Sequence, residues 1–269
     1  MRHNITLYLR LLQVQLHSQL QYRFSFLLEL LATMLTSIFE FGALALVLQR
    51  FETIQGWTVG EVAFLYGLVE LSFGIMDMIF SGFDPPDFGQ TVRKGTFDQL
   101  LLRPINITMQ VLGSRFIIRR FGKIISGTII FIYALNHTNI IWTPFKISYI
   151  PVIVISMVAF FGGLFIIGST ITFWTVDSIE FINIFTYGGS FLISHPMHIY
   201  NRWLRHIFTY LVPAIFLVYY PALLILDKPD PLGFPSFAPY LAPPAGFSVL
   251  LVAYLFWGFG IRHYQSTGS

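Results

Sequence analysis

The sequence predicts an all-α polytopic membrane protein, and three observations carry that prediction. Hydrophobic residues make up 55% of the chain and charged residues only 11%, with a mean hydropathy of +0.69. Long apolar stretches alternate with short polar intervals, and each stretch is long enough as a helix to cross a hydrocarbon core of about 30 Å. Lys and Arg gather in a few of the intervals, a distribution that orients membrane proteins. We therefore expect one transmembrane domain over residues 1–269.

Residues 1–21 predict an amphipathic helix that lies in the membrane interface. Leu9, Leu12 and Leu16 recur at helical spacing, while Arg10 lies on another face. Polar residues interrupt the segment too often for a signal peptide. A helix packed on another subunit is the alternative interpretation.

Six segments are expected to span the membrane as helices, with one short helix between the second and third. Five of the spans are residues 24–48, 62–83, 113–135, 147–173 and 245–261, and the remaining one lies within residues 178–226. The short helix, residues 96–103, lies between the second and third spans. It combines a capping-box pattern, Thr96 with Gln99, and a stop at Pro104. So short a helix cannot bury its apolar side alone, and we expect this side to meet a membrane surface or another protein; it consists of Phe97, Leu100 and Leu101.

Charge counting places the N-terminus and residues 84–123 on the cytoplasmic side. Arg50, Lys146 and Lys228 are then outside. The basic residues expected inside are Arg2, Arg10, Arg23, Arg93, Lys94, Arg103, Arg115, Arg119, Arg120, Lys123 and Arg262. Both termini are cytoplasmic in this arrangement.

Two threadings of residues 178–226 satisfy the charge rule equally well. In the first, 178–195 is the fifth span and 200–226 is an external re-entrant hairpin broken at Pro213. In the second, the segment near 179–200 stays at the inner surface and 206–226 is the fifth span.

Polar residues recur at helical spacing along the first two spans. The stripes are Glu29, Thr33, Thr36 and Glu40 on the first span, and Glu70, Gly74 and Asp77 on the second. A carboxylate facing lipid is costly, so we expect both stripes to face protein or water, packed on each other through glycines. Either they line a polar pathway, or they only join the helices by hydrogen bonds.

A basic cluster marks the start of the third span: Arg115, Arg119, Arg120 and Lys123. The cluster suits anionic headgroups, the cytoplasmic side or an acidic partner. An ordinary snorkelling anchor is the simpler alternative.

Catalytic and metal-binding motifs are absent from the sequence. Gly122-Lys123 is followed by Ile124, so no phosphate-binding loop is formed there. His195 and His198 flank Pro196, which argues against a helical metal site, and the chain has no Cys. We expect no cofactor or metal on this chain, and any energy-converting domain to be a separate chain.

Residues 93–104 (RKGTFDQLLLRP) and 110–112 (QVL) resemble the signature region of ABC-2 type transporter permeases. The branch concerned is the uncharacterised transport-system permease component. His195-Pro196, Tyr220-Pro221 and the tail 260–266 extend the resemblance over nearly the whole chain.

This resemblance implies six spans, an N-terminal interfacial helix and external re-entrant helices between spans five and six, which favours the first threading. It also implies that the helix 96–103 is a cytoplasmic coupling helix that docks on a separate ATPase, and that this ATPase binds ATP and Mg. The docking residues it implies are Gly95, Thr96, Phe97, Asp98, Leu100, Leu101 and Arg103. The membrane core would be a homodimer, or a heterodimer with a related permease, in the plasma (inner) membrane of a prokaryote.

The function expected is ATP-driven export of a hydrophobic, lipid-linked or amphipathic substrate, with lipids but no nucleic acid as further partners. A channel or an ion- or proton-coupled transporter is the alternative. It would use the intramembrane carboxylates Glu29, Glu40, Glu70 and Asp77. An intramembrane enzyme has less support, because no nucleophile and base are visible.

Overall fold

The computed structural model describes residues 13, 15, 17, 23–51, 53, 55–117, 120–175 and 181–266. Within these residues the chain forms helices and no strands, which confirms the all-α class. The interfacial helix predicted for 1–21 lies mostly outside the described residues, as do Arg119 and the start of the predicted fifth span.

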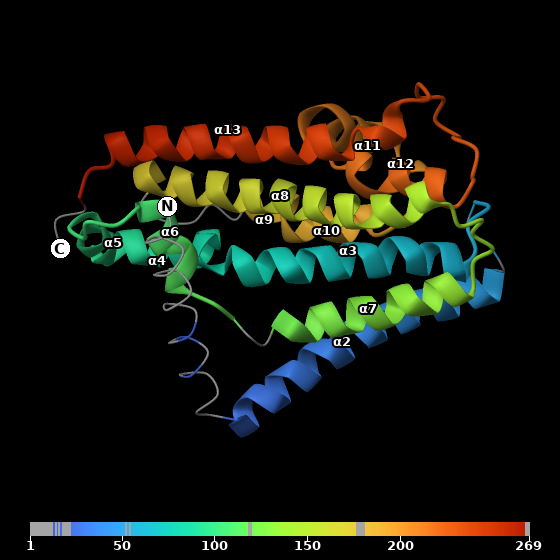
Figure 1. Cartoon of the computed structure of the whole chain (residues 1–269), viewed down its shortest axis with the longest axis horizontal. Coiled ribbons are helices and arrows are strands. Elements are labelled where there is room, and N and C mark those ends of the chain that lie inside the picture. The colour runs from blue at the N-terminus through green and yellow to red at the C-terminus, as the bar shows by residue number, and fades with distance from the viewer. Residues whose placement is uncertain are drawn as a thin grey trace.

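In the described part of the chain, four helices are long and apolar enough to cross a membrane. They are α2 Arg23–Phe51, α3 Val59–Ile79, α8 Pro144–Thr175 and α13 Ala242–His263. They run along the long axis of the molecule, with α2 inclined to the others (Figure 1). Each overlaps one of the predicted spans.

Shorter apolar helices fill the remaining positions. They are α7 Phe121–Asn136, α9 Phe181–Phe185 and α10 Tyr187–Ile193. A further pair, 202–211 and 215–225, is bent by 103° and consists of α11 Arg202–His206, the π-turn Ile207–Leu211 and α12 Ile215–Ile225. The described residues therefore hold four membrane-length helices, or five if the bent pair is one span, and length alone does not give the expected six.

The predicted third span is broken near its start. Helix α6 covers Ile107–Ser114, the chain is extended at Arg115 (φ −137°, ψ 133°), and α7 begins at Phe121. The hydroxyl of Ser81 donates to the Arg115 carbonyl at 2.8 Å, a bond that takes the place of a helical one. Arg115 and Lys123 therefore do not lie on one helix, although the predicted span 113–135 includes both.

The core is built by backbones in close approach. A Cβ on Gly67 of α3 would lie 2.6 Å from the Phe131 nitrogen of α7, and one on Gly127 of α7 would lie 2.4 Å from the Leu71 nitrogen. A Cβ on Gly246 of α13 would lie 2.2 Å from the Ser156 oxygen of α8. Small residues thus join α3 to α7 and α8 to α13. The expectation that glycines join the first two spans was wrong.

The two ends of the helix bundle are formed by different elements. At one end lie α4 Pro85–Arg93, α5 Thr96–Leu101 and α6, beside the end of α13 (Figure 1). Short 3₁₀ turns link elements at both ends: Ser81–Phe83, Met197–Ile199 and Ala238–Tyr240.

At the other end, the segments before α11 and after α12 both meet the start of α3. His198 Nε2 lies 3.3 Å from the Gln55 carbonyl, and Lys228 Nζ lies 2.8 Å from Glu61. Lys146 Nζ lies 2.6 Å from Asp227 at the same end. The bent pair α11–α12 therefore starts and finishes near one place.

Candidate functional site

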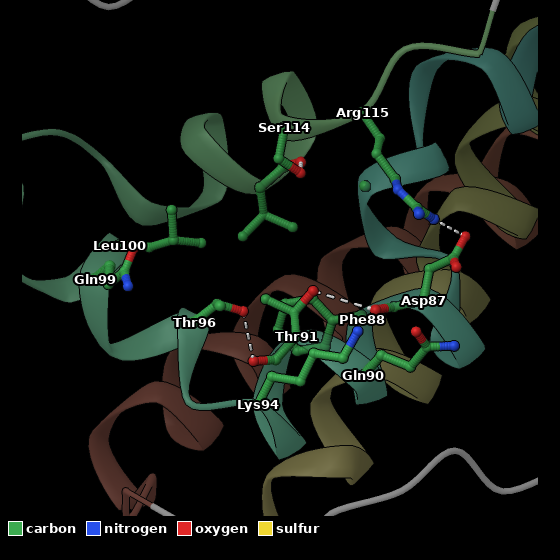
Figure 2. Close-up of a pocket in the computed structure, with 12 residues that line it drawn as sticks. Asp87, Phe88, Gln90, Thr91, Lys94, Thr96, Gln99, Leu100, Ser114 and Arg115 are labelled. Carbon is green, nitrogen blue, oxygen red and sulfur yellow. Dashed lines mark hydrogen bonds and ion pairs between the residues drawn. The ribbon is translucent and has the colours of Figure 1, made fainter. Parts of the chain in front are cut away.

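Helix α5, which contains the predicted docking residues, begins at a turn rather than at a capped start. Its N-cap is Gly95, whose φ of +66° is favourable for glycine, and no side chain caps the helix. The Thr96 hydroxyl instead donates back to the Thr91 carbonyl of α4 at 2.9 Å (Figure 2). The predicted capping box of Thr96 and Gln99 was wrong, because this left-handed turn folds α5 onto α4.

Phe97 lies in the core of its own chain. Its side chain is 0% exposed, and its ring centroid lies 5.5 Å from that of Phe88, 5.0 Å from Phe173 and 5.0 Å from Tyr264. Trp257 of α13 completes the aromatic cluster at 6.2 Å. The expectation that Phe97 meets a partner was wrong, since the short helix buries this side chain against α4, α8 and α13.

The exposed apolar side chains of α5 lie at its carboxyl end. Leu102 is 86% exposed and Leu101 38%, and Arg103 is exposed beside them. Leu100 is half-buried, and Asp98 accepts a hydrogen bond from Ser266 of the tail at 2.6 Å. Of the predicted docking residues, Leu101 and Arg103 are therefore exposed, and Leu102, which was not among them, is the most exposed apolar side chain beside them.

A polar cavity of about 430 Å³ lies between α4, α5 and α6 (Figure 2). Lys94, Gln99 and Ser114 line it, and one wall is the ion pair of Arg115 with Asp87. Buried Gln110 fixes α6 to the end of α5, because its side-chain nitrogen donates to the Leu100 carbonyl at 3.1 Å. No sequence pattern predicted this cavity, because it depends on how three short helices pack.

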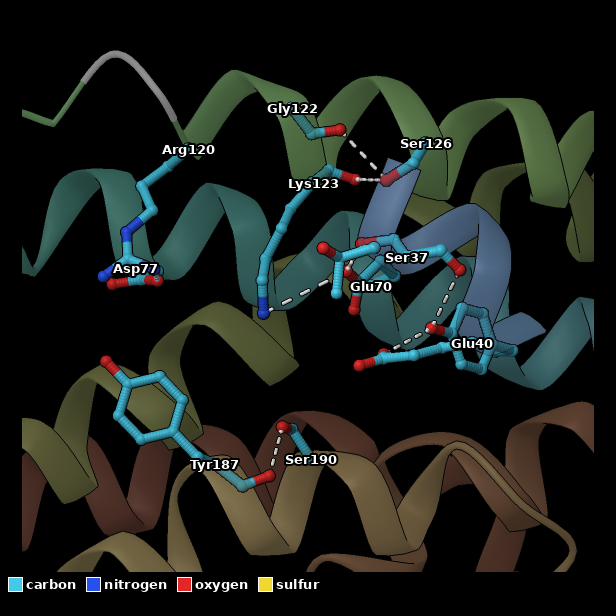
Figure 3. A network of polar contacts seen from close by, with 12 residues as sticks. Ser37, Glu40, Glu70, Asp77, Arg120, Gly122, Lys123, Ser126, Tyr187 and Ser190 are labelled. Carbon is cyan, nitrogen blue, oxygen red and sulfur yellow. Dashed lines mark hydrogen bonds and ion pairs between the residues drawn. The ribbon is translucent and has the colours of Figure 1, made fainter. Parts of the chain in front are cut away.

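Charged and polar side chains meet at the contacts of α3 with α2 and α7 (Figure 3). Ser37 donates to Glu70 at 2.6 Å, and Lys123 Nζ lies 4.0 Å from the same carboxylate. Tyr66 donates to Glu40 at 3.2 Å. Both carboxylates thus lie at helix contacts.

A second ion pair lies closer to the end that holds α4. Arg120 lies 2.9 Å from Asp77, whose side chain is 0% exposed (Figure 3). We call the three ion pairs Asp87–Arg115, Asp77–Arg120 and Glu70–Lys123 the charged seam. It joins α4 and α3 to the chain between α6 and the first turn of α7.

Asp84 follows the end of α3 and lies near the charged seam. Burial, reinforced by the negative charge of Asp77, raises the pKa of Asp84 to about 6. Arg120 and the hydrogen bond that Tyr187 donates at 3.3 Å act in the opposite direction. This carboxyl group therefore titrates close to neutral pH.

Not all of the predicted stripe enters these contacts. The hydroxyls of Thr33 and Thr36 each donate at 2.9 Å to a backbone carbonyl one turn earlier, and Glu29 is exposed. Gly74 packs on Lys123, where an added Cβ would lie 3.0 Å from that side chain. The structure thus places Glu40, Glu70, Gly74 and Asp77 at contacts of α3, whereas Thr33 packs on α7, where a Cβ added to Gly122 would lie 3.0 Å from the Thr33 side chain.

Sequence reasoning missed Ser37, Tyr66 and Tyr187. Ser37 precedes Glu40 by one turn and Tyr66 precedes Glu70 by one turn, so a search for polar residues at helical spacing could have found both. Tyr187 has no such signal. No group of three His, Asp or Glu side chains suited to a metal ion occurs within the described ranges.

Comparison with known proteins identifies one family. A search of curated proteins and one of solved structures each found no match. Residues 31–268 match the family model of the ABC-2 family transporter proteins, which confirms the resemblance carried by residues 93–104. Because the match covers most of the 269 residues, the chain belongs to the ABC-2 transporter family.

Proposed function

We propose that the chain is the membrane-spanning subunit of an ATP-driven exporter and that a separate ATPase docks on the end formed by α4, α5 and α6. Family membership is the single observation that carries this proposal. The exposed Leu102 and its neighbours Leu101 and Arg103 form the contact surface. Asp98, Gly95 and Thr96 hold the helix in place behind them.

Phe97 is the residue through which a movement of α5 reaches the long helices. It contacts Phe173 of α8 and Trp257 of α13, so a displacement of α5 by the ATPase displaces two long helices with it. The ion pair of Arg115 with Asp87 joins α4 to the chain that leads into α7. Both routes begin at the docking end.

We further propose six membrane crossings with both termini cytoplasmic. Helices α7 and α9–α10 are the two short crossings, and α11–α12 is an external re-entrant hairpin. The contacts of His198 and Lys228 with the segment that begins α3 support the hairpin, because they bring both of its ends to one side. The membrane is the plasma (inner) membrane of a prokaryote.

The substrate class and the partner permease follow from the family resemblance. We propose outward movement of a hydrophobic, lipid-linked or amphipathic substrate, and pairing with a second permease chain that is either identical or related. A channel function for Glu70 and Asp77 has less support, since each carboxylate is already paired with a cation.

Purification from the native cells tests the docking surface. A tagged Leu102→Glu chain should recover far less of a P-loop ATPase, and less ATP hydrolysis, than the unmodified chain, because a carboxylate then lies in an apolar contact. Ile141→Glu is the matched control, since Ile141 is 72% exposed at the opposite end of the bundle. Equal recovery of the ATPase with both variants would contradict the docking assignment.

A further inference from the structure

A second cavity, of about 270 Å³, lies at the re-entrant hairpin. It is formed by α11 and the π-turn that follows, together with the segment after α12. Figure 1 shows where α11 and α12 lie in the bundle. Arg202, Arg205 and His206 line one part of it, and Tyr210 and Phe234 line another. Cationic and aromatic side chains thus share one hollow.

Among the described residues, no carboxylate partners the two arginines of this cavity. No described residue places a carboxylate oxygen within 4.0 Å of the guanidinium of Arg202 or Arg205. Asp230 lies on the neighbouring segment, but its oxygens accept backbone N–H groups of Leu232 and Phe234 at 2.9 and 2.7 Å. Two guanidinium groups three residues apart on a helix repel each other unless an anion lies between them.

The position of these arginines along the bundle is unusual. In the proposed orientation they are outside, whereas Lys and Arg favour the cytoplasmic side. Trp203 and Tyr210 beside them are 69% and 73% exposed, as aromatic residues at a membrane interface are. The cavity therefore opens at the depth of lipid headgroups.

A buried hydroxyl lies behind the same cavity. Tyr220 is 1% exposed, its ring packs 5.2 Å from that of Phe234, and its hydroxyl has no hydrogen-bond partner in the described part of the chain. A buried donor without a partner is unfavourable. Tyr220 does not line the cavity itself, and its ring supports the wall that Phe234 forms.

We propose that this cavity binds the phosphate group of an anionic phospholipid in the outer leaflet. Arg202 and Arg205 donate to the phosphate oxygens, since the planar guanidinium suits bidentate contact. Tyr210 and Phe234 contact the apolar part next to the headgroup. The inference rests on the proposed function for the outward orientation of the hairpin, and it assigns the cavity a ligand class.

Titration of the purified full-length chain with a short-chain phosphatidylglycerol, followed by tryptophan fluorescence, tests the site. The double variant Arg202→Gln/Arg205→Gln should raise the Kd at least tenfold, and Arg202→Lys/Arg205→Lys should raise it less because the charge is kept. Arg50→Gln is the matched control, because Arg50 is also exposed at the outer end of the bundle and does not line the cavity. Its Kd should stay within twofold of the unmodified chain.

Three results would overturn the proposal or its ligand. An unchanged Kd in the Arg202→Gln/Arg205→Gln variant would remove the site, and so would equal affinity for the matching phosphatidylcholine, which has no net charge. Displacement of the lipid by an equal concentration of inorganic phosphate would overturn the lipid as the ligand and leave a soluble phosphate. The titration needs no ATPase, so a chain that binds the lipid but recovers no ATPase contradicts only the proposed function.

Discussion

The basic residues of the charged seam and those of the hairpin cavity have opposite surroundings. Arg115, Arg120 and Lys123 each lie against a carboxylate of α3 or α4. Arg202 and Arg205 have no such partner among the described residues. Cations of the first kind hold the helices together, while cations of the second kind are left for a ligand.

Burial explains why the first group must be paired. A charged group out of water is stable only beside an opposite charge or several hydrogen bonds, and Asp77 is fully buried. The side chain of Arg120 is 20% exposed, so this pair is the one most removed from solvent in the charged seam. The comparison therefore predicts a ranking of stability effects.

Arg120→Gln should have the largest effect. It leaves the carboxylate of Asp77 buried without its cation, which lowers the free energy of unfolding by about 3–5 kcal/mol. Thermal unfolding of the purified chain in detergent measures the loss. The double variant Asp77→Asn/Arg120→Gln should recover most of the stability, because both charges are then removed. A double variant no more stable than Arg120→Gln would contradict the pairing.

Asp84 tests the charged seam by pH. Its pKa of about 6 in the folded chain lies above the ordinary 3.8, so the folded state holds the proton more tightly than the unfolded state. The stabilisation is complete below about pH 4 and is lost as pH rises through about 6, amounting to about 3 kcal/mol at most. Asp84→Asn should remove this part of the pH dependence of the melting temperature. An identical pH profile in the variant would show that the pKa of Asp84 is the same in the folded and unfolded states, and would contradict the raised pKa.

Lys146 is a paired cation at the end of the bundle that holds Arg202, so its substitution separates the effect of pairing from the effect of location. Lys146 is 7% exposed and donates to the Ile225 carbonyl at 3.0 Å and to Asp227 at 2.6 Å. Lys146→Gln should therefore lower the free energy of unfolding by about 2 kcal/mol in the same unfolding assay, although it lies at the end that holds Arg202. No loss of stability would mean that the end of the bundle, and not pairing, decides the effect.

The long apolar helices could be predicted because length and hydropathy are local properties of the sequence. The burial of Phe97 could not be predicted. A two-turn helix with an apolar side has the same sequence pattern whether that side contacts a partner or the core of its own chain. Phe173 and Trp257, which bury it, come from helices far along the chain. The local sequence pattern therefore predicted that helix α5 exists but not which residues it contacts.

The break in the third span could not be predicted either, because it too depends on a contact between residues far apart in the sequence. Residues 113–135 are apolar enough for one helix, but Ser81, which bonds the Arg115 carbonyl, lies 34 positions away. The polar spacing of α3 predicted a contact with protein or water for Glu70 and Asp77, while the basic cluster was expected to suit anionic headgroups, the cytoplasmic side or an acidic partner. That Arg120 and Lys123 pair with these two carboxylates was not predicted. Partner choice in a membrane bundle depends on helix packing, which the spacing of one helix does not contain.

The smallest effect on stability should come from the hairpin arginines. Arg202→Gln/Arg205→Gln should change the free energy of unfolding by less than about 0.5 kcal/mol in lipid-free detergent, because neither guanidinium has a carboxylate among its described neighbours. The unfolding assay used for Arg120→Gln checks this directly. A slight gain is compatible, since removing both charges ends their mutual repulsion. A loss of unfolding free energy close to that of Arg120→Gln would mean that Arg202 and Arg205 stabilise the fold. The distinction between cations that pair with carboxylates and cations that are available to a ligand would then be wrong.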